Sequence, residues 1–298
     1  MSGRPRIGLA LGAGGARGWC HIGALRALAE LGVTPDLVAG TSMGALVGAA
    51  WAANRLEALE EWVLALTPAR FMRLMDVSLR SGGLVEATGI ETLLADLGIP
   101  ARIEDLPHPF TAIATDMETG REVWLTRGPT HPAVRASAGI PGVMSPKLLD
   151  GKWLLDGGLT NPVPVSATRA LGADVIIAIN PNGRPGGRFW QPPEPRGSAT
   201  ARMAALLPEA LTEALGLDPQ AEKPTAPNYF DVLTAAIEVM EAQIRRARLA
   251  GEPPHVLLNA AFSDLMVLEL YRGAEAIAEG RRMVERQRHS ILEMLENI

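Results

Sequence analysis

The sequence predicts an α/β fold, with a parallel-rich central sheet and helices on both sides, and three observations support this. An apolar strand at 6–11, a glycine loop and a helix at about 19–31 lead into a second apolar run at 37–39. This order is a βαβ unit, whose two strands run parallel. The second run continues through a sharp turn into an Ala-rich buried helix at 45–53. Residues 175–179, Val-Ile-Ile-Ala-Ile, are a continuous apolar run typical of a buried parallel strand.

The turn after the second strand has the context of a nucleophile elbow: a strand, a sharp turn that carries a serine, and a helix. A side chain at either flank of this turn would collide with the strand or the helix, so glycine is suited there. The serine is thereby pushed out at the sheet edge, at the positive end of a helix dipole that favours an oxyanion. We therefore interpret Ser42 as a candidate nucleophile, and its elbow is Gly40, Thr41, Met43 and Gly44.

The glycine loop at 12–18, Gly-Ala-Gly-Gly-Ala-Arg-Gly, allows two interpretations. A dinucleotide fingerprint needs G-x-G-x-x-G and an acidic residue near the end of the second strand. Here Gly18, which would be the third glycine of the fingerprint, comes one residue too late. The serine turn, not an acidic residue, occupies the end of the second strand. In the alternative, an oxyanion hole, small residues let backbone N–H groups converge on an anion beside Ser42. The candidates for the hole are Gly12, Gly14, Gly15, Ala16 and Arg17. The Arg17 side chain could add a charge or brace the loop.

Composition limits the other classes of function. The 298 residues, 47% of them hydrophobic, allow a substantial core, and we expect one domain over 1–298. A net charge of −5 provides no basic field for nucleic acid, and a single cysteine excludes an intrachain disulfide. Apolar stretches near 45–53 and 256–262 are shorter than the roughly 20 residues of a membrane span. The expected compartment is the cytoplasm, with peripheral membrane contact allowed. The oligomeric state is not indicated.

The middle of the chain alternates helical and hairpin patterns. We expect helices at 54–66 and within 67–105, where they would form a rim over the site, and later at 133–137 and 165–171. Hairpins are expected for 110–116 with 122–126, and for 148–149 with 153–155. A carboxylate at a strand end beside Gly157 and Gly158 could be presented to a site without obstruction. Spacing alone does not favour Asp156 over Asp116 or Asp150.

The last third begins with a segment, 181–228, that is rich in proline and glycine. Proline removes ladder donors, so we expect an excursion outside the sheet, interrupted by a helix near 199–215. Its apolar groups would suit a mobile cover that meets a lipid surface, and a passive surface loop is the alternative. The pattern then predicts a helix at 229–250, a strand at 255–260, and helices at 264–279 and 280–296.

Four segments, in order over most of 6–180, resemble the patatin-like phospholipases in their bacterial form. The segments are Gly12–Gly18 with His21-Ile22-Gly23; Gly40–Ala45; Ala114-Thr115-Asp116 with Val134–Ser137, Ile140-Pro141-Gly142 and Pro146; and Asp156-Gly157-Gly158 with Asn161–Pro164.

The resemblance implies a patatin-like three-layer architecture and a Ser–Asp dyad. Ser42 matches the nucleophile, Asp156 the base, and the glycine loop the oxyanion hole, although the family often has glycine where Ala13 stands. The implied activity is that of a serine acyl hydrolase that cleaves carboxylic esters of lipids, phospholipids or lysophospholipids, without metal or organic cofactor. A glycine-loop nucleotide-binding protein and a catalytically idle lipid-binding regulatory protein stay open as alternatives.

Histidines offer a competing base. His21 lies in the first helix, beyond the glycine loop, and we interpret it as structural. An ordinary α/β-hydrolase would place an aspartate and then a histidine after the serine, so His255 or His289 would be its candidates.

Overall fold

The computed structural model describes residues 4–74, 88–183 and 229–296, together with the isolated positions 189, 212 and 227. Within that part of the chain, the centre is an eight-stranded sheet in the order β5-β6-β3-β2-β1-β7-β8, and β4 pairs with β3 off this path. The strands are β1 (Ile7–Leu11), β2 (Leu37–Thr41), β3 (Phe110–Asp116), β4 (Glu122–Leu125), β5 (Lys147–Leu149), β6 (Lys152–Asp156), β7 (Val175–Asn180) and β8 (Val256–Asn259).

The sheet divides into a parallel half and an antiparallel half. Strand β1 runs parallel to both β2 and β7, and parallel pairing continues outward to β3 and β8. Strands β4, β5 and β6 pair antiparallel, because short turns join β3 to β4 and β5 to β6. The predicted parallel-rich sheet is therefore confirmed, and both expected hairpins are present.

Helices cover both faces of the sheet. They are α1 (Cys20–Glu30), α2 (Met43–Ala52), α3 (Leu56–Leu64), α4 (Pro68–Leu74), α5 (Thr88–Asp96), α6 (Thr130–Ser137), α7 (Val165–Ala170), α10 (Tyr229–Gly251), α11 (Gly273–Arg286) and α12 (Arg288–Glu296). The described residues also form short 3-10 helices: η1 (Gly15–Trp19), η2 (Ile103–Asp105), η3 (Gly157–Leu159) and η4 (Leu270–Arg272).

Side chains alternate between the two faces of the sheet along each strand, so a hydrophobic core forms on each face. In β1, Leu9 and Leu11 face a large core that also includes residues of α1, α2, α3 and α11. Ala10 faces the opposite way, toward Ile176 of β7 and Val165 of α7, and the partly buried Leu249 of α10 packs against this second core. Because successive side chains point to opposite faces, one fully apolar strand supports both layers of helices.

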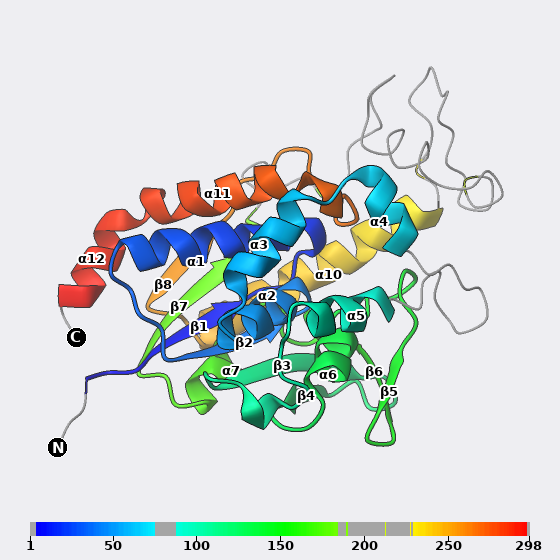
Figure 1. Cartoon of the computed structure of the whole chain (residues 1–298), viewed down its shortest axis with the longest axis horizontal. Coiled ribbons are helices and arrows are strands. Elements are labelled where there is room, and N and C mark those ends of the chain that lie inside the picture. The colour runs from blue at the N-terminus through cyan, green and yellow to red at the C-terminus, as the bar shows by residue number, and fades with distance from the viewer. Residues whose placement is uncertain are drawn as a thin grey trace.

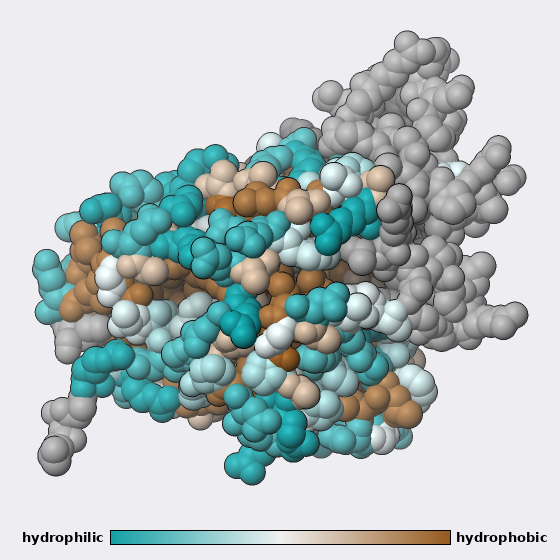
Figure 2. All heavy atoms as spheres, viewed as in Figure 1, coloured by the Kyte–Doolittle hydropathy of each residue, from teal (hydrophilic) through white to brown (hydrophobic). Residues whose placement is uncertain are grey.

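Helices α1 and α11, which lie far apart in the sequence, run side by side over one face of the sheet (Figure 1). Glycine permits their close approach: a β-carbon at Gly23 would lie 1.9 Å from the carbonyl oxygen of Ile277, and one at Gly280 would lie 2.0 Å from that of Cys20. Hydrophilic residues cover most of the face in view, and apolar atoms show as smaller areas between them (Figure 2).

The predicted helix bounds near the C-terminus are wrong. Helix α11 begins at Gly273, not at 264, and it continues through Gly280, where the sequence suggested a boundary. The glycine at 280 serves the contact with α1 and does not end a helix. Residues 260–269 form a connection between β8 and η4 instead.

The expected cover at 183–227, the helix near 199–215 and residues 75–87 of the expected rim lie almost entirely outside the described residues. Among the helices that the structure describes, none combines the length and apolar character needed to cross a bilayer.

Candidate active site

The turn between β2 and α2 is too tight for side chains at its flanks. A β-carbon at Gly40 would lie 2.3 Å from the carbonyl oxygen of Gly44, and one at Gly44 would lie 2.1 Å from that of Leu11. Between them Ser42 has φ 57° and ψ −122°, in the left-handed half of backbone space. Non-glycine residues adopt such a conformation at a cost of about 1–3 kcal/mol, and it is often associated with functional sites.

Neighbouring residues hold the turn in place. The backbone N–H of Ser42 donates to Ser137 Oγ at 2.9 Å, and Thr41 Oγ1 donates to the carbonyl oxygen of Asn161 at 2.8 Å. The side chain of Met43 lies against Gly18, where a β-carbon would be 2.4 Å from Met43 Cγ. These contacts tie the elbow to α6, to the loop before α7 and to the glycine loop.

Asp156 ends strand β6 and meets Ser42. The Ser42 hydroxyl donates to Asp156 Oδ2 at 2.6 Å, and the N–H of Gly158 donates to Asp156 Oδ1 at 2.7 Å. A β-carbon at Gly157 would lie 2.2 Å from the carbonyl oxygen of Ile113, so glycine allows this strand end to approach β3. Burial raises the pKa of Asp156 to about 6, while the hydrogen bonds from Ser42 and Gly158 oppose that rise.

The carboxylates of the other two candidate aspartates are engaged at turns or lie in them: Asp116 is the last residue of β3, and Asp150 lies in a hairpin turn. Asp116 Oδ1 accepts hydrogen bonds from the N–H groups of Glu118 and Thr119 at 3.0 and 3.2 Å. Asp150 occupies the hairpin turn between β5 and β6 with φ 49°. The tertiary structure thus brings Asp156 to Ser42, whereas Asp116 bonds to the turn after β3 and Asp150 stays in the turn between β5 and β6.

The glycine loop divides into residues that anchor it and residues with free donors. The N–H groups of Gly12, Ala13 and Ala16 donate to the carbonyl oxygens of Ile179, Pro162 and Val267 at 2.9, 2.8 and 2.8 Å, and that of Arg17 donates within the loop to Gly14.

Among the described residues, the N–H groups of Gly14 and Gly15 have no acceptor. Both residues line one cavity together with Ser42 and Asp156. Gly14 and Gly15 are therefore the two members of the predicted set whose N–H groups are available to an oxyanion. Gly12, Ala16 and Arg17 hold the loop.

Arg17 braces the loop with its side chain. The guanidinium is buried, and it donates from Nε to the carbonyl oxygen of Leu265 at 3.0 Å and from Nη1 to Asn182 Oδ1 at 2.6 Å. It also forms an ion pair with Glu238 of α10. Of the two roles left open for Arg17, the contacts favour the brace.

Histidines lie away from the cavity in the described part of the chain. His21 Nε2 is 2.8 Å from the carbonyl oxygen of Gly12, and burial lowers the His21 pKa to about 4. His255 Nδ1 accepts a hydrogen bond from the N–H of Ile176 at 2.9 Å. These contacts are structural, as expected for His21.

Several residues of the cavity were not predicted from the sequence. Helix α10 contributes Glu238 and Glu241, and residues 266–268 form part of the wall. Burial raises the pKa of Glu241 to about 8, and the nearby charges of Asp156 and Glu238 add to that rise. No spacing signal marked these residues, because they follow the Pro-rich segment and reach the site only through the fold.

Comparison with known proteins identifies the family. Residues 9–169 match the family model for patatin-like phospholipases. An uncharacterized NTE family protein from Mycobacterium tuberculosis is 34% identical in an alignment 328 residues long. The alignment covers 95% of this chain and 91% of that protein.

Two animal proteins match over shorter stretches. Patatin-like phospholipase domain-containing protein 7 from Mus musculus is 36% identical over 185 residues, or 60% of this chain and 14% of that protein. Neuropathy target esterase sws from Drosophila melanogaster is 36% identical over 181 residues, which cover 58% of this chain and 13% of that protein. The chain therefore belongs to the patatin-like phospholipase family of lipid-hydrolysing enzymes.

Proposed function

We propose that the protein is a serine acyl hydrolase that cleaves carboxylic ester bonds of lipids through a Ser42–Asp156 dyad and an acyl-enzyme. The observation that carries the proposal is the 2.6 Å hydrogen bond from Ser42 Oγ to Asp156 Oδ2, in a cavity that the Gly14 and Gly15 backbones also line. Nucleophile, base and oxyanion donors are the three parts that acyl transfer needs.

In the first half-reaction, Ser42 Oγ attacks the ester carbonyl while Asp156 takes the hydroxyl proton. A carboxylate with an ordinary pKa is a weak base toward a hydroxyl, and a pKa near 6 brings Asp156 closer to the working pH. The negative charge that develops on the carbonyl oxygen is stabilised by the N–H groups of Gly14 and Gly15. When the tetrahedral intermediate collapses, Asp156 returns the proton to the departing alcohol.

In the second half-reaction, water attacks the acyl-Ser42 ester. Asp156 takes a proton from the water, the same backbone donors stabilise the second oxyanion, and the proton then returns to Ser42 Oγ as the fatty acid leaves. The hydrogen bond from Gly158 to Asp156 Oδ1 keeps Oδ2 directed at the serine in both halves.

The cavity supports a lipid as substrate. Its wall contains the apolar side chains of Ile140, Val143, Ile237 and Leu268, which suit an acyl chain better than a sugar or a peptide. We propose phospholipids or lysophospholipids as the substrate class, and peripheral contact with a membrane surface as the way the enzyme meets them.

A fluorophosphonate probe tests the proposal. We expect a covalent adduct on Ser42 in the wild type and none in Ser42→Ala, because the probe reacts with an activated serine. Asp156→Asn should fold and lose turnover by orders of magnitude on an ester lipid. His21→Ala serves as the control and should retain chemistry. An adduct on Ser145 with an active Ser42→Ala variant would refute the assignment.

A further inference from the structure

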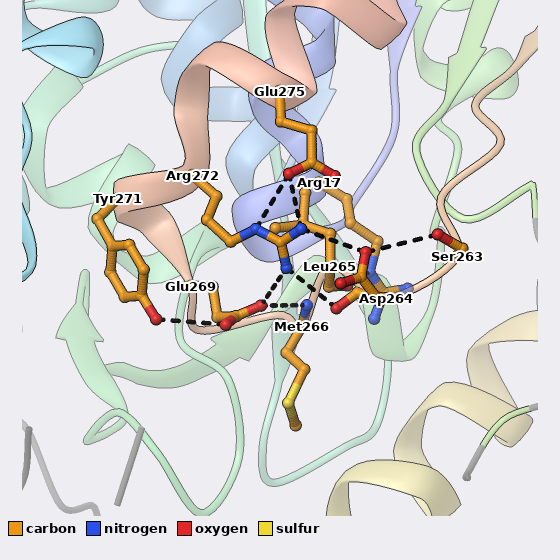
Figure 3. A network of polar contacts seen from close by, with 9 residues as sticks. All are labelled: Arg17, Ser263, Asp264, Leu265, Met266, Glu269, Tyr271, Arg272 and Glu275. Atoms are coloured by element: carbon orange, nitrogen blue, oxygen red, sulfur yellow. Dashed lines mark hydrogen bonds and ion pairs between the residues drawn. The ribbon is translucent and has the colours of Figure 1, made fainter. Parts of the chain in front are cut away.

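An ion-pair network centred on the buried Glu269 holds together the connection between β8 and α11 (Figure 3). Glu269 is fully buried, and its carboxylate accepts hydrogen bonds from Arg272 Nη1 at 2.9 Å, from the Met266 N–H at 3.1 Å and from Tyr271 Oη at 3.2 Å. Arg272 also reaches forward to Glu275 Oε2 at 2.6 Å. We call residues 264–272 the brace segment.

Arg272 connects both ends of the brace segment. It donates from Nη1 to the carbonyl oxygen of Asp264 and from Nη2 to Asp264 Oδ1, both at 3.2 Å. One planar guanidinium thus holds the first residue of the segment, the buried Glu269 and the first turn of α11. A lysine could not do the same, because its ammonium is a point charge without a fixed fork of donors.

Two carbonyl groups of the brace segment contact the glycine loop. The carbonyl oxygen of Val267 accepts from the N–H of Ala16 at 2.8 Å, and that of Leu265 accepts from Arg17 Nε at 3.0 Å. A β-carbon at Gly15 would lie 2.4 Å from the carbonyl oxygen of Val267, so the two backbones are in close contact. Figure 3 shows Arg17 reaching this segment from behind.

The contact between Ala16 and Val267 lies next to the two free N–H groups of the glycine loop. Upstream of Gly14 and Gly15, the loop is fixed by Gly12 and Ala13 bonding to the sheet and to the chain before α7. Downstream, the Ala16 N–H is fixed by the brace segment, which lies about a hundred residues beyond the part that matches the family model. The two free donors therefore lie between an upstream anchor formed by Ile179 and Pro162 and a downstream anchor formed by Val267 of the brace segment.

We propose that Arg272, through Glu269 and the brace segment, is a positioning residue for the oxyanion donors at Gly14 and Gly15. This inference rests on the proposed function, since it assumes that those N–H groups stabilise the transition state. Misplacement of a preorganised donor by a fraction of an ångström costs rate without changing ground-state binding to the same extent.

The test compares Arg272→Gln with a matched variant, Arg286→Gln. Arg286 lies on α11 and pairs with the buried Glu279, so its loss also strips an arginine from a buried carboxylate. Its hydrogen bonds go to Glu279 and to the carbonyl oxygen of Asn259, both outside the brace segment. Three quantities are measured: the rate of fluorophosphonate labelling of Ser42, the turnover of an ester lipid, and the binding of a non-hydrolysable ether analogue.

We expect Arg272→Gln to lower both labelling rate and kcat by about 10- to 100-fold, while ether-analogue binding changes by less than about threefold. Arg286→Gln should stay within about twofold of the wild type in all three. Arg272→Lys should fall between Arg272→Gln and the wild type, because it restores the charge beside Glu269 and not the bridge.

Circular dichroism and a melting curve establish whether each variant folds. If Arg272→Gln does not fold, the labelling rates of Glu275→Gln and Arg272→Lys test the proposal in its place. Glu275 is 45% exposed, so its removal spares the buried pair and loosens only the outer bond of Arg272. A labelling loss of about threefold or more in a folded variant supports the proposal.

Labelling at the wild-type rate in folded Arg272→Gln, or in both milder variants, would overturn the proposal. A parallel loss of labelling and ether-analogue binding would also overturn it, because it would assign the segment to the cavity wall alone. Failure of the wild type to be labelled at Ser42 would instead overturn the proposed function.

Discussion

Replacing Asp156 by asparagine should stabilise the protein at neutral pH while it removes the proposed base. Asparagine is isosteric, so it can still accept from the Gly158 N–H and hydrogen-bond Ser42 Oγ. The reason for the gain is the burial of the carboxylate, which is 3% exposed and has a pKa of about 6 in place of 3.8. A shift of about two pKa units corresponds to ~3 kcal/mol of free energy.

The sign follows from proton binding. The folded-state pKa of Asp156 is raised, so between pH 3.8 and about 6 the folded state holds a proton that the unfolded chain has released. The group therefore contributes stability that is fully present below pH 3.8 and is lost as the pH rises through about 6. Asparagine does not titrate, and its free energy of unfolding lacks this contribution at every pH.

The measurement is the free energy of unfolding from denaturant titrations of both proteins at several pH values. Between roughly pH 5 and pH 7.5, the wild type should lose about 1.4 kcal/mol relative to Asp156→Asn, most of it below about pH 6.5. Asn54→Asp changes the net charge at an exposed position, so it controls for the effect of net charge alone on the free energy of unfolding. A difference between wild type and Asp156→Asn that does not change with pH would refute the reasoning.

Three other predictions concern the same site. Gly44→Ala should unfold or inactivate the enzyme, because its β-carbon would lie 2.1 Å from a β1 carbonyl oxygen. The control is Gly251→Ala, at the last residue of α10, where a β-carbon meets nothing within 4 Å; its melting curve should stay close to that of the wild type. Glu241→Gln should remove a fall in kcat/KM above about pH 8, because an ionised carboxylate there opposes the oxyanion; an unchanged pH profile contradicts this. Ser137→Ala removes the acceptor for the Ser42 N–H and should lower the labelling rate by about tenfold, with Ser145→Ala as the control.

Local patterns were sufficient for the elements that carry the proposed nucleophile and the loop beside it. The strand, turn and helix around Ser42 are encoded by apolar runs that end at Gly40 and begin after Gly44, and the backbone there excludes any larger residue. The order strand, helix, strand fixes that the two strands are parallel, so the glycine loop and the elbow meet at one sheet edge. The resemblance, not the spacing, selected Asp156 from three aspartates in turn-like contexts.

Only the tertiary structure decided which groups of these elements are free and which are engaged. Gly14 and Gly15 differ from Ala16 because Val267, some 250 positions away in the sequence, takes the Ala16 N–H. The acidic Glu241 likewise reaches the cavity through a helix that follows a long proline-rich segment. Short-range periodicity determines where a strand or helix forms, since it depends on neighbours a few residues apart. Hydrogen-bond satisfaction and pKa depend on contacts between distant segments, which no local pattern encodes.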